Sequence, residues 1–254
     1  MNRRRAVLRG VAICASLVGL VAATTGAASA DSGRYGGNLE AASAAIPAQA
    51  GDVATDSSNQ VQRPWGGSIR GSAVATSSAT CDGCQATAVT MQVIYTRHVH
   101  AMTVDNVAAA WSSCTACSGS ALSLQVVIAR KAGLVRANNR SLALNVACVQ
   151  CSTAAAAVQI VVIAPSMREL SRQALNDIAA LRDELAAELA TQLAPVAQAP
   201  AVQATPRGQA LAKPSAVTPN ARQALTTATT QLQSVITKDL GASSATHDLQ
   251  VRTG

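Results

Sequence analysis

The chain is almost free of aromatic side chains. Its 254 residues include no phenylalanine, two tryptophans and two tyrosines, so aromatics make up only 2% of the sequence. Aromatic residues each bury about 150–250 Å² and supply much of an ordinary core. The hydrophobic fraction is 49%, but a core made here has to be thin and built from Ala, Val, Ile and Leu. We therefore expect covalent cross-links to compensate for the missing buried area.

Charge is also scarce. Charged residues make up 13% of the chain, and the formal net charge is +7. Segment 1–30 holds four arginines and no acidic residue, and subtracting these four charges from +7 leaves +3. No stripe of Lys and Arg interleaved with aromatic residues follows. The composition therefore excludes the electrostatic pattern of a nucleic-acid-binding protein.

Long apolar runs and enzyme motifs are missing as well. After position 30 no stretch reaches the roughly 18 apolar residues of a membrane span, and the longest run, 154–165, contains Gln159. The chain has no His-Glu-x-x-His, no Gly-x-Ser-x-Gly and no phosphate-binding loop. We predict no catalytic residue, no cofactor-binding residue, no metal ligand and no stable membrane span.

Between Cys81 and Ile163 the sequence repeats one pattern three times. Each copy has a Cys-x-x-Cys and, at the same offset from its first cysteine, a glutamine followed by branched apolar residues. The copies are Cys81 and Cys84 with Gln92, Cys114 and Cys117 with Gln125, and Cys148 and Cys151 with Gln159. Because the three first cysteines are also almost evenly spaced, the pattern indicates an internal repeat.

Each repeat unit is predicted to be two strands joined at its Cys-x-x-Cys corner. Segments such as 121–129 are short, rich in branched residues and bounded by turn-forming residues, which favours strands. A helical interpretation also stays open, because Cys81, Cys84, Ala88 and Tyr95 follow one another at steps of 3, 4 and 7. We predict a mainly β repeat domain at 71–165, with about six short strands that close or stack. The glutamine either points inward and bonds across neighbouring units or faces water.

The flanking segments are predicted from composition. Residues 1–30 have a basic start, an apolar run and Ala28-Ser29-Ala30, the form of an export signal, and both Sec and twin-arginine export fit it. Residues 31–70 are rich in Gly, Ala and Ser and are predicted to be a flexible linker. Residues 195–254 are predicted to be a low-complexity tail with a weak helix at 220–240 and disorder after Gly241.

An amphipathic helix is predicted at 166–194. Ser166 and Glu169 have the spacing of a capping box, which places the helix start there. Apolar residues then recur at steps of three and four: Met167, Leu170, Ala174, Ile178, Leu181, Leu185 and Leu189. We expect this face to cover one side of the repeat domain. Self-association as a short coiled coil is the alternative.

The six repeated cysteines fit three alternative functions. Structural disulfides fit an exported chain with a poor core and an even number of cysteines, although six cysteines allow 15 pairings. A redox centre would need a cation or a helix N-terminus to lower a thiol pKa. A zinc site needs four ligands, so two pairs would fill one site, or His98 and His100 would join Cys81 and Cys84. The first interpretation makes Cys81, Cys84, Cys114, Cys117, Cys148 and Cys151 disulfide candidates.

The repeated corner, its Gln-Val-Val segment and the following charged helix resemble an uncharacterised group of exported Cys-x-x-Cys repeat proteins of high-GC Gram-positive bacteria. The resemblance covers about 72–193. In some relatives a similar region is appended to a peptide zinc metalloprotease module, but that protease motif is absent here, so the resemblance implies no peptidase activity. It implies export and supplies no biochemical role.

We therefore predict an exported, disulfide-stapled, non-catalytic structural or interaction module. It would be secreted or held outside the cytoplasm, and its partner would be a protein or a component of the cell envelope. The alternative is an extracytoplasmic thiol-redox or metal-binding protein that uses its Cys-x-x-Cys pairs.

Overall fold

The computed structural model describes residues 35–130, 133–166, 168–192, 218–242 and 245–254. The predicted export signal at 1–30 and residues 195–217 of the predicted low-complexity tail lie outside these residues. The elements in chain order are β1 (Tyr35–Ala45), β2 (Val53–Gln62), β3 (Trp65–Ala79), β4 (Gln85–Arg97), β5 (Ala101–Ser112), β6 (Ser118–Arg130), β7 (Leu134–Asn145), β8 (Ser152–Ile163), α1 (Arg172–Thr191), α2 (Pro219–Leu240) and β9 (Ala245–Thr253).

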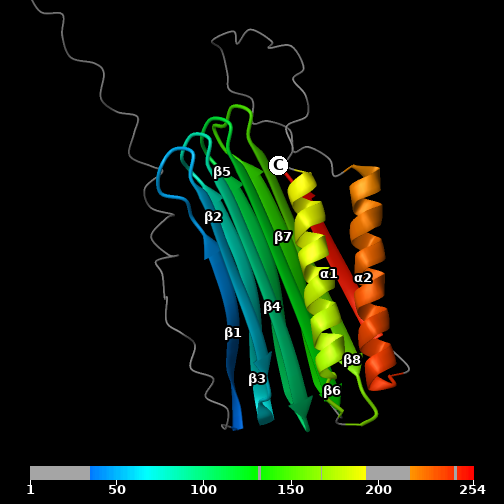
Figure 1. The fold of residues 1–254 in the computed structure, drawn as a ribbon. Coiled ribbons are helices and arrows are strands. Elements are labelled where there is room, and N and C mark those ends of the chain that lie inside the picture. The colour runs from blue at the N-terminus through cyan, green and yellow to red at the C-terminus, as the bar shows by residue number, and fades with distance from the viewer. Residues whose placement is uncertain (1–34, 131–132, 167, 193–217, 243–244) are drawn as a thin grey trace, which may run out of the picture. The chain divides into compact units, whose positions relative to one another are not determined.

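The strands form two parallel stacks that face each other. Strands β1, β3, β5 and β7 pair in one stack, and β2, β4, β6 and β8 pair in the other, because each turn carries the chain from one stack to the other (Figure 1). We call them the odd stack and the even stack. This is a β-solenoid, so the prediction of a mainly β repeat is confirmed. The described strands are nevertheless more numerous than six, and those in the stacks have 10–15 residues.

The solenoid begins earlier in the chain than the cysteine repeat. Residues 31–70 were predicted to be a flexible linker, but β1 and β2 lie within them and form the first turn of the solenoid. The turn between these strands has the same internal hydrogen bond as the turn at 81–84: Asp52 N donates to Gln49 O at 3.0 Å, as Cys84 N donates to Cys81 O at 3.1 Å. Residues 49–52 are therefore a corner of the same kind without cysteine.

The space between the stacks changes in character along the strands. At the corner end it is filled by alanine and cysteine side chains, including Ala75, Ala88, Ala121, Cys84 and Cys117. Buried amides and hydroxyl groups follow in the middle. The far end has larger side chains, including Ile94, Met102 and Val127. The interior is therefore thinnest where the cysteines lie.

Both helices lie over the even stack (Figure 1). Leu185 and Leu189 of α1 and Leu225 and Leu232 of α2 share one core with the outward side chains of β4, β6 and β8. The prediction that an apolar helix face covers the repeat domain is confirmed, and that face is unavailable for the coiled-coil alternative. None of the described helices has the length and apolarity of a membrane span.

The helix α1 starts six residues later than the predicted 166. Ser171 is its N-cap and accepts a hydrogen bond from Ala174 N at 3.1 Å. Glu169 does not complete a capping box, because its carboxylate accepts two hydrogen bonds from Arg63, at 2.7 and 2.8 Å. These bonds hold the pKa of Glu169 below its usual value. The segment before the helix is thus tied to the turn after β2.

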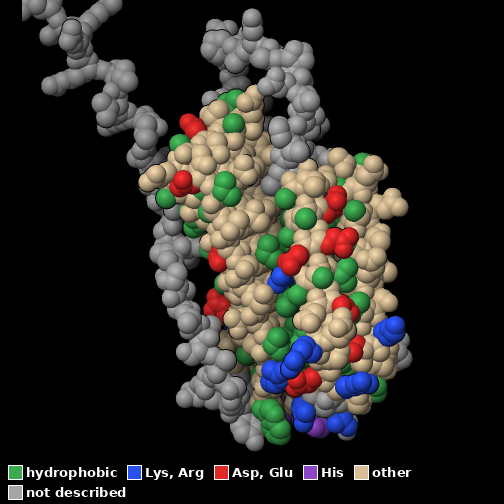
Figure 2. Space-filling model, viewed as in Figure 1, with side chains coloured by type: hydrophobic (Ala, Val, Ile, Leu, Met, Phe, Trp, Pro, Cys, Tyr) green, Lys and Arg blue, Asp and Glu red, His purple; other side chains and the backbone are tan. Residues whose placement is uncertain are grey.

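A second contact fixes the same segment to the sheet. Leu170 N donates to the hydroxyl of Tyr95 at 3.1 Å, and Arg63 lies over the Tyr95 ring, 5.5 Å from its centroid. Burial raises the pKa of Tyr95. Figure 2 shows that basic side chains gather at this end of the molecule, where α1 begins and α2 ends.

The C-terminal segment is ordered in the structure, contrary to the predicted disorder after Gly241. The predicted weak helix is present as α2, which ends at Gly241 in the left-handed conformation. The chain then turns back, and β9 pairs antiparallel with β8 from Ala245 to Thr253. Every second residue of β9 is polar, and Leu249 and Val251 between them pack against the helix-side core.

Candidate functional site

The site with the most distinctive chemistry is the column of turns that holds the six cysteines. We call residues 81–84, 114–117 and 148–151 the first, second and third cysteine corners. In each, the third residue has a positive φ: 70° at Gly83, 54° at Ala116 and 57° at Gln150. This left-handed residue folds the chain back so that the two cysteines face each other, with Cα atoms 5.4–6.0 Å apart.

The left-handed position predicts opposite effects for exchanging glycine and alanine. Gly83→Ala should lower the free energy of unfolding by about 1 kcal/mol, because the backbone becomes strained even though an added Cβ makes only an ordinary contact with Gly51. Ala116→Gly should leave it unchanged or raise it by up to about 1 kcal/mol. Urea denaturation of both variants measures the difference. Equal destabilisation by both changes would contradict a left-handed requirement.

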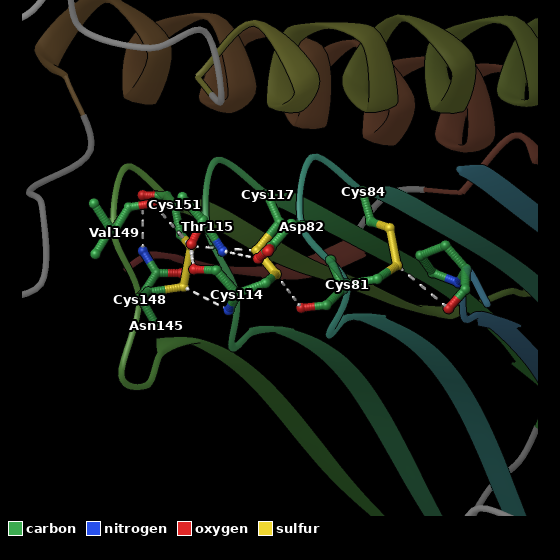
Figure 3. The surroundings of a disulfide bond; sticks show 12 residues. Cys81, Asp82, Cys84, Cys114, Thr115, Cys117, Asn145, Cys148, Val149 and Cys151 are labelled. Atoms are coloured by element: carbon green, nitrogen blue, oxygen red, sulfur yellow. Dashed lines mark hydrogen bonds between the residues drawn. A yellow bond between two sulfur atoms is a disulfide. The ribbon is translucent and has the colours of Figure 1, made fainter. Parts of the chain in front are cut away.

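The corners are stacked by hydrogen bonds between neighbouring turns. Gly83 N donates to Thr115 O at 2.8 Å, and Ala116 N donates to Val149 O at 2.8 Å. The side chain of Asp82 adds a further bond, accepting from Thr115 N at 2.8 Å. Figure 3 shows the resulting column, with its disulfides side by side. Each corner is therefore held in register with the next one.

The structure closes one disulfide within each corner: Cys81–Cys84, Cys114–Cys117 and Cys148–Cys151. The sequence left this pairing open. Cys84 and Cys117 are buried, and the other four cysteines are partly exposed. The disulfides contact the preceding turn: Cys84 Sγ lies 2.9 Å from Gln49 O, and Cys151 Sγ lies 2.9 Å from Cys114 O.

The second and third corners differ from the first in the contact between their sulfurs. Cys117 Sγ lies 3.2 Å from Cys151 Sγ, although the two atoms belong to different disulfides. Together with Cys114, they form a group of three sulfurs within 4.8 Å of one another. Three thiolates so placed suit a thiophilic cation, but a sulfur in a disulfide has no thiolate to offer.

The histidines proposed as partners for the first corner are placed elsewhere. Cys81 and Cys84 precede β4, and His98 and His100 follow it. Thirteen residues of strand span about 40 Å. The structure therefore excludes one metal site made by these four residues, because they lie at opposite ends of β4.

The turns around the corner column carry no basic side chain. Segments 46–52, 80–84, 113–117 and 146–151 include Asp52 and Asp82 but no Lys, Arg or His. A redox-active Cys-x-x-Cys needs a nearby cation or helix N-terminus to favour its thiolate. These turns supply no such cation, so the local charge favours a stable disulfide over a reactive thiol.

The repeated glutamines form a ladder inside the solenoid. Gln159 Nε2 donates to Gln125 Oε1 at 2.6 Å, Gln125 Nε2 to Gln92 Oε1 at 2.7 Å, and Gln92 Nε2 to Gln62 Oε1 at 2.7 Å. Three of these amides are buried. The prediction of an inward amide bonded across neighbouring units is confirmed, and the alternative that it faces water is wrong.

A shorter ladder of asparagines, which was not predicted from the sequence, lies beside it. The buried side chain of Asn106 donates to Asn139 Oδ1 at 2.8 Å and to Val158 O at 2.9 Å. It also accepts from Ser123 Oγ at 2.6 Å. Asn106 and Asn139 stand at equivalent positions of successive units and pair in register, and their periodic spacing was the signal available in the sequence.

A comparison with protein-family models finds no match, and comparisons with curated proteins and with solved structures find none either. The interpretation of the corner column therefore depends on its own geometry.

Proposed function

We propose that this chain is an exported, non-catalytic structural or interaction module whose corner column is a set of covalent staples. One observation carries the proposal: the three disulfides close the end of the solenoid where the interior is made of alanine and cysteine. Alanine offers a single methyl group to a core, so burial there contributes little stabilisation. Disulfides of this kind persist in oxidising compartments, which supports a location outside the cytoplasm.

The face of the odd stack that neither described helix covers supports the interaction part of the proposal. The helices lie over the even stack, while Trp111 of β5 and Leu142 and Leu144 of β7 are 38%, 50% and 41% exposed. These side chains alternate with the buried residues of their strands and therefore point away from the even stack. A strand surface with exposed Trp and Leu side chains fits a protein or cell-envelope partner better than solvent alone.

Thiol counting on the purified mature protein tests the proposal. We expect no free thiol in the six corner positions, three disulfides confined to the three corners by mass mapping, and loss of the fold on reduction. Retention of the fold after complete reduction would refute the staple role. Six free thiols in protein isolated without reductant would refute the oxidised state itself.

The alternative function is a thiol-redox or metal-binding protein, and one observation favours it: the three sulfurs of Cys114, Cys117 and Cys151 that lie within 4.8 Å. The same preparation distinguishes it from the staple. A corner that exchanges rapidly with small disulfides, or zinc in stoichiometric amount, would favour the alternative.

A further inference from the structure

We propose that Cys117 and Cys151 form a thiol–disulfide exchange site that joins the second and third cysteine corners. The site allows a disulfide to move from one corner to the next without unfolding of the chain. This inference needs the oxidised corners of the proposed function, but it does not need the staple role or export. Its co-reactant is a dithiol, whether a small molecule or the Cys-x-x-Cys of another protein.

The disulfides of the second and third corners are in contact. Exchange occurs when a thiolate attacks one sulfur of a disulfide and expels the other. Cys117 Sγ lies 3.2 Å from Cys151 Sγ, so the attacking and attacked atoms are already in contact. The hydrogen bond from Ala116 N to Val149 O holds the two corners in this register.

The groups around the third corner determine which sulfur leaves. Cys114 N points its hydrogen at Cys148 Sγ, at 3.4 Å, and an amide donor stabilises a thiolate that forms there. Cys151 Sγ instead lies 2.9 Å from Cys114 O, whose partial negative charge opposes a thiolate on that sulfur. Attack at Cys151 with departure of Cys148 is therefore the favoured direction.

Exposure determines which sulfur of the second corner receives the external thiol. Cys117 is 1% exposed, whereas Cys114 is only partly buried. One thiolate of the dithiol attacks Cys114 Sγ, forms a mixed disulfide and expels Cys117 as a thiolate. Cys117 then attacks Cys151, the Cys117–Cys151 bond forms, and Cys148 leaves as a thiolate that takes a proton from water.

Two further steps release the dithiol as a disulfide and leave the protein reduced by two electrons. The second thiolate of the dithiol attacks its own mixed disulfide and frees Cys114, so the dithiol becomes a disulfide and the protein gains two electrons. Cys114 can then attack Cys117, which restores the Cys114–Cys117 bond and expels Cys151, and Cys151 takes a proton from water so that a neutral thiol lies beside Cys114 O. Reduction that enters at the second corner thus leaves the third corner as two thiols.

The first corner provides a matched control. Its sulfurs contact backbone carbonyls of the preceding turn: Cys84 Sγ lies 2.9 Å from Gln49 O, and Cys81 Sγ lies 3.8 Å from Pro47 O. The preceding turn, 46–52, contains no cysteine. A thiol freed at Cys84 therefore has no disulfide to attack in the preceding turn. Toward the following turn, no sulfur of the second corner lies within 4.8 Å of both Cys81 and Cys84 in the described part of the chain, whereas Cys117 is in contact with Cys151.

The test uses Cys114→Ser, which leaves Cys117 as a thiol without any added reductant. After incubation at about pH 8.5, near the ordinary thiol pKa, the protein is quenched with acid, alkylated and digested with trypsin. Cleavage after Arg130 and Arg140 separates the second corner from the third. We expect the label on Cys148 and a disulfide that links the two peptides through Cys117 and Cys151. Cys81→Ser should keep its label on Cys84, with no linked peptides.

A label that stays on Cys117 in Cys114→Ser, with Cys148–Cys151 intact, would overturn the exchange site while leaving the staple role standing. If that variant does not fold, the wild-type protein treated with one equivalent of dithiothreitol gives the same answer. The Cys117–Cys151 peptide should then form before any link that involves the first corner. Its absence throughout the reduction would overturn the proposal.

Discussion

Replacing all six corner cysteines with serine is expected to remove roughly 6 kcal/mol from the free energy of unfolding. Closing a ring of four residues contributes about 2 kcal/mol through the entropy of the unfolded chain, and there are three such rings. Typical domain stabilities are about 5–15 kcal/mol, so the variant should be unfolded or close to it at 37 °C. Guanidinium denaturation followed by circular dichroism measures the change.

Three double variants with one corner each changed to serine provide the controls for this prediction. Each should lose about 2 kcal/mol, and the losses should add if the corners act independently. Wild-type protein in excess reductant should behave like the six-serine variant. A six-serine variant that unfolds at the same guanidinium concentration as the oxidised wild type would contradict the staple role.

Interrupting the glutamine ladder is expected to cost about 3 kcal/mol, because each buried polar group left without a partner costs about 1–3 kcal/mol. Gln125→Leu keeps the approximate volume of the side chain but leaves Gln92 Oε1 without its donor. Gln159 Nε2 would keep only its longer bond to Val104 O, at 3.4 Å. Urea denaturation of the oxidised variant measures the loss.

Gln85→Leu is the matched control for the ladder. Gln85 is the first residue of β4, a strand of the even stack, which also contains Gln125, and its side chain is exposed. The same substitution there should change the free energy of unfolding by no more than about 0.5 kcal/mol. Equal effects at positions 85 and 125 would show that the ladder contributes nothing beyond an ordinary surface glutamine.

The repeat could be predicted because its signals are local and periodic. Cysteine and glutamine recur at a fixed offset, and the parallel register converts that offset into contact, with Gln92, Gln125 and Gln159 aligned in one row. The first turn of the solenoid has the same form but was missed, because Gln49 and Asp52 stand where the later corners have cysteine. Gln60 aligns with Gln92 and was the remaining signal.

The predictions for the helix start and for the C-terminal segment were wrong because contacts between residues far apart in the sequence determine both. Ser166 and Glu169 match a capping pattern, but the ion pair between Glu169 and Arg63 joins residues 106 positions apart and could not be predicted from local spacing. The strand β9 was missed for a similar reason. It pairs with β8, which is far away in the sequence, and the polar residues of its outer face make the segment look like a solvated tail.

The direction of β9 limits how the molecule can assemble. A parallel stack that ended at β8 would present backbone groups in the register of every preceding rung, and such an edge can template the addition of further chains, as in a growing fibril. The last strand covers that edge from Ala154 to Val162 and runs the opposite way. It carries Asp248 and Arg252 on its exposed polar face. Strand β9 therefore covers the β8 edge of this stack and opposes the addition of further chains at that edge.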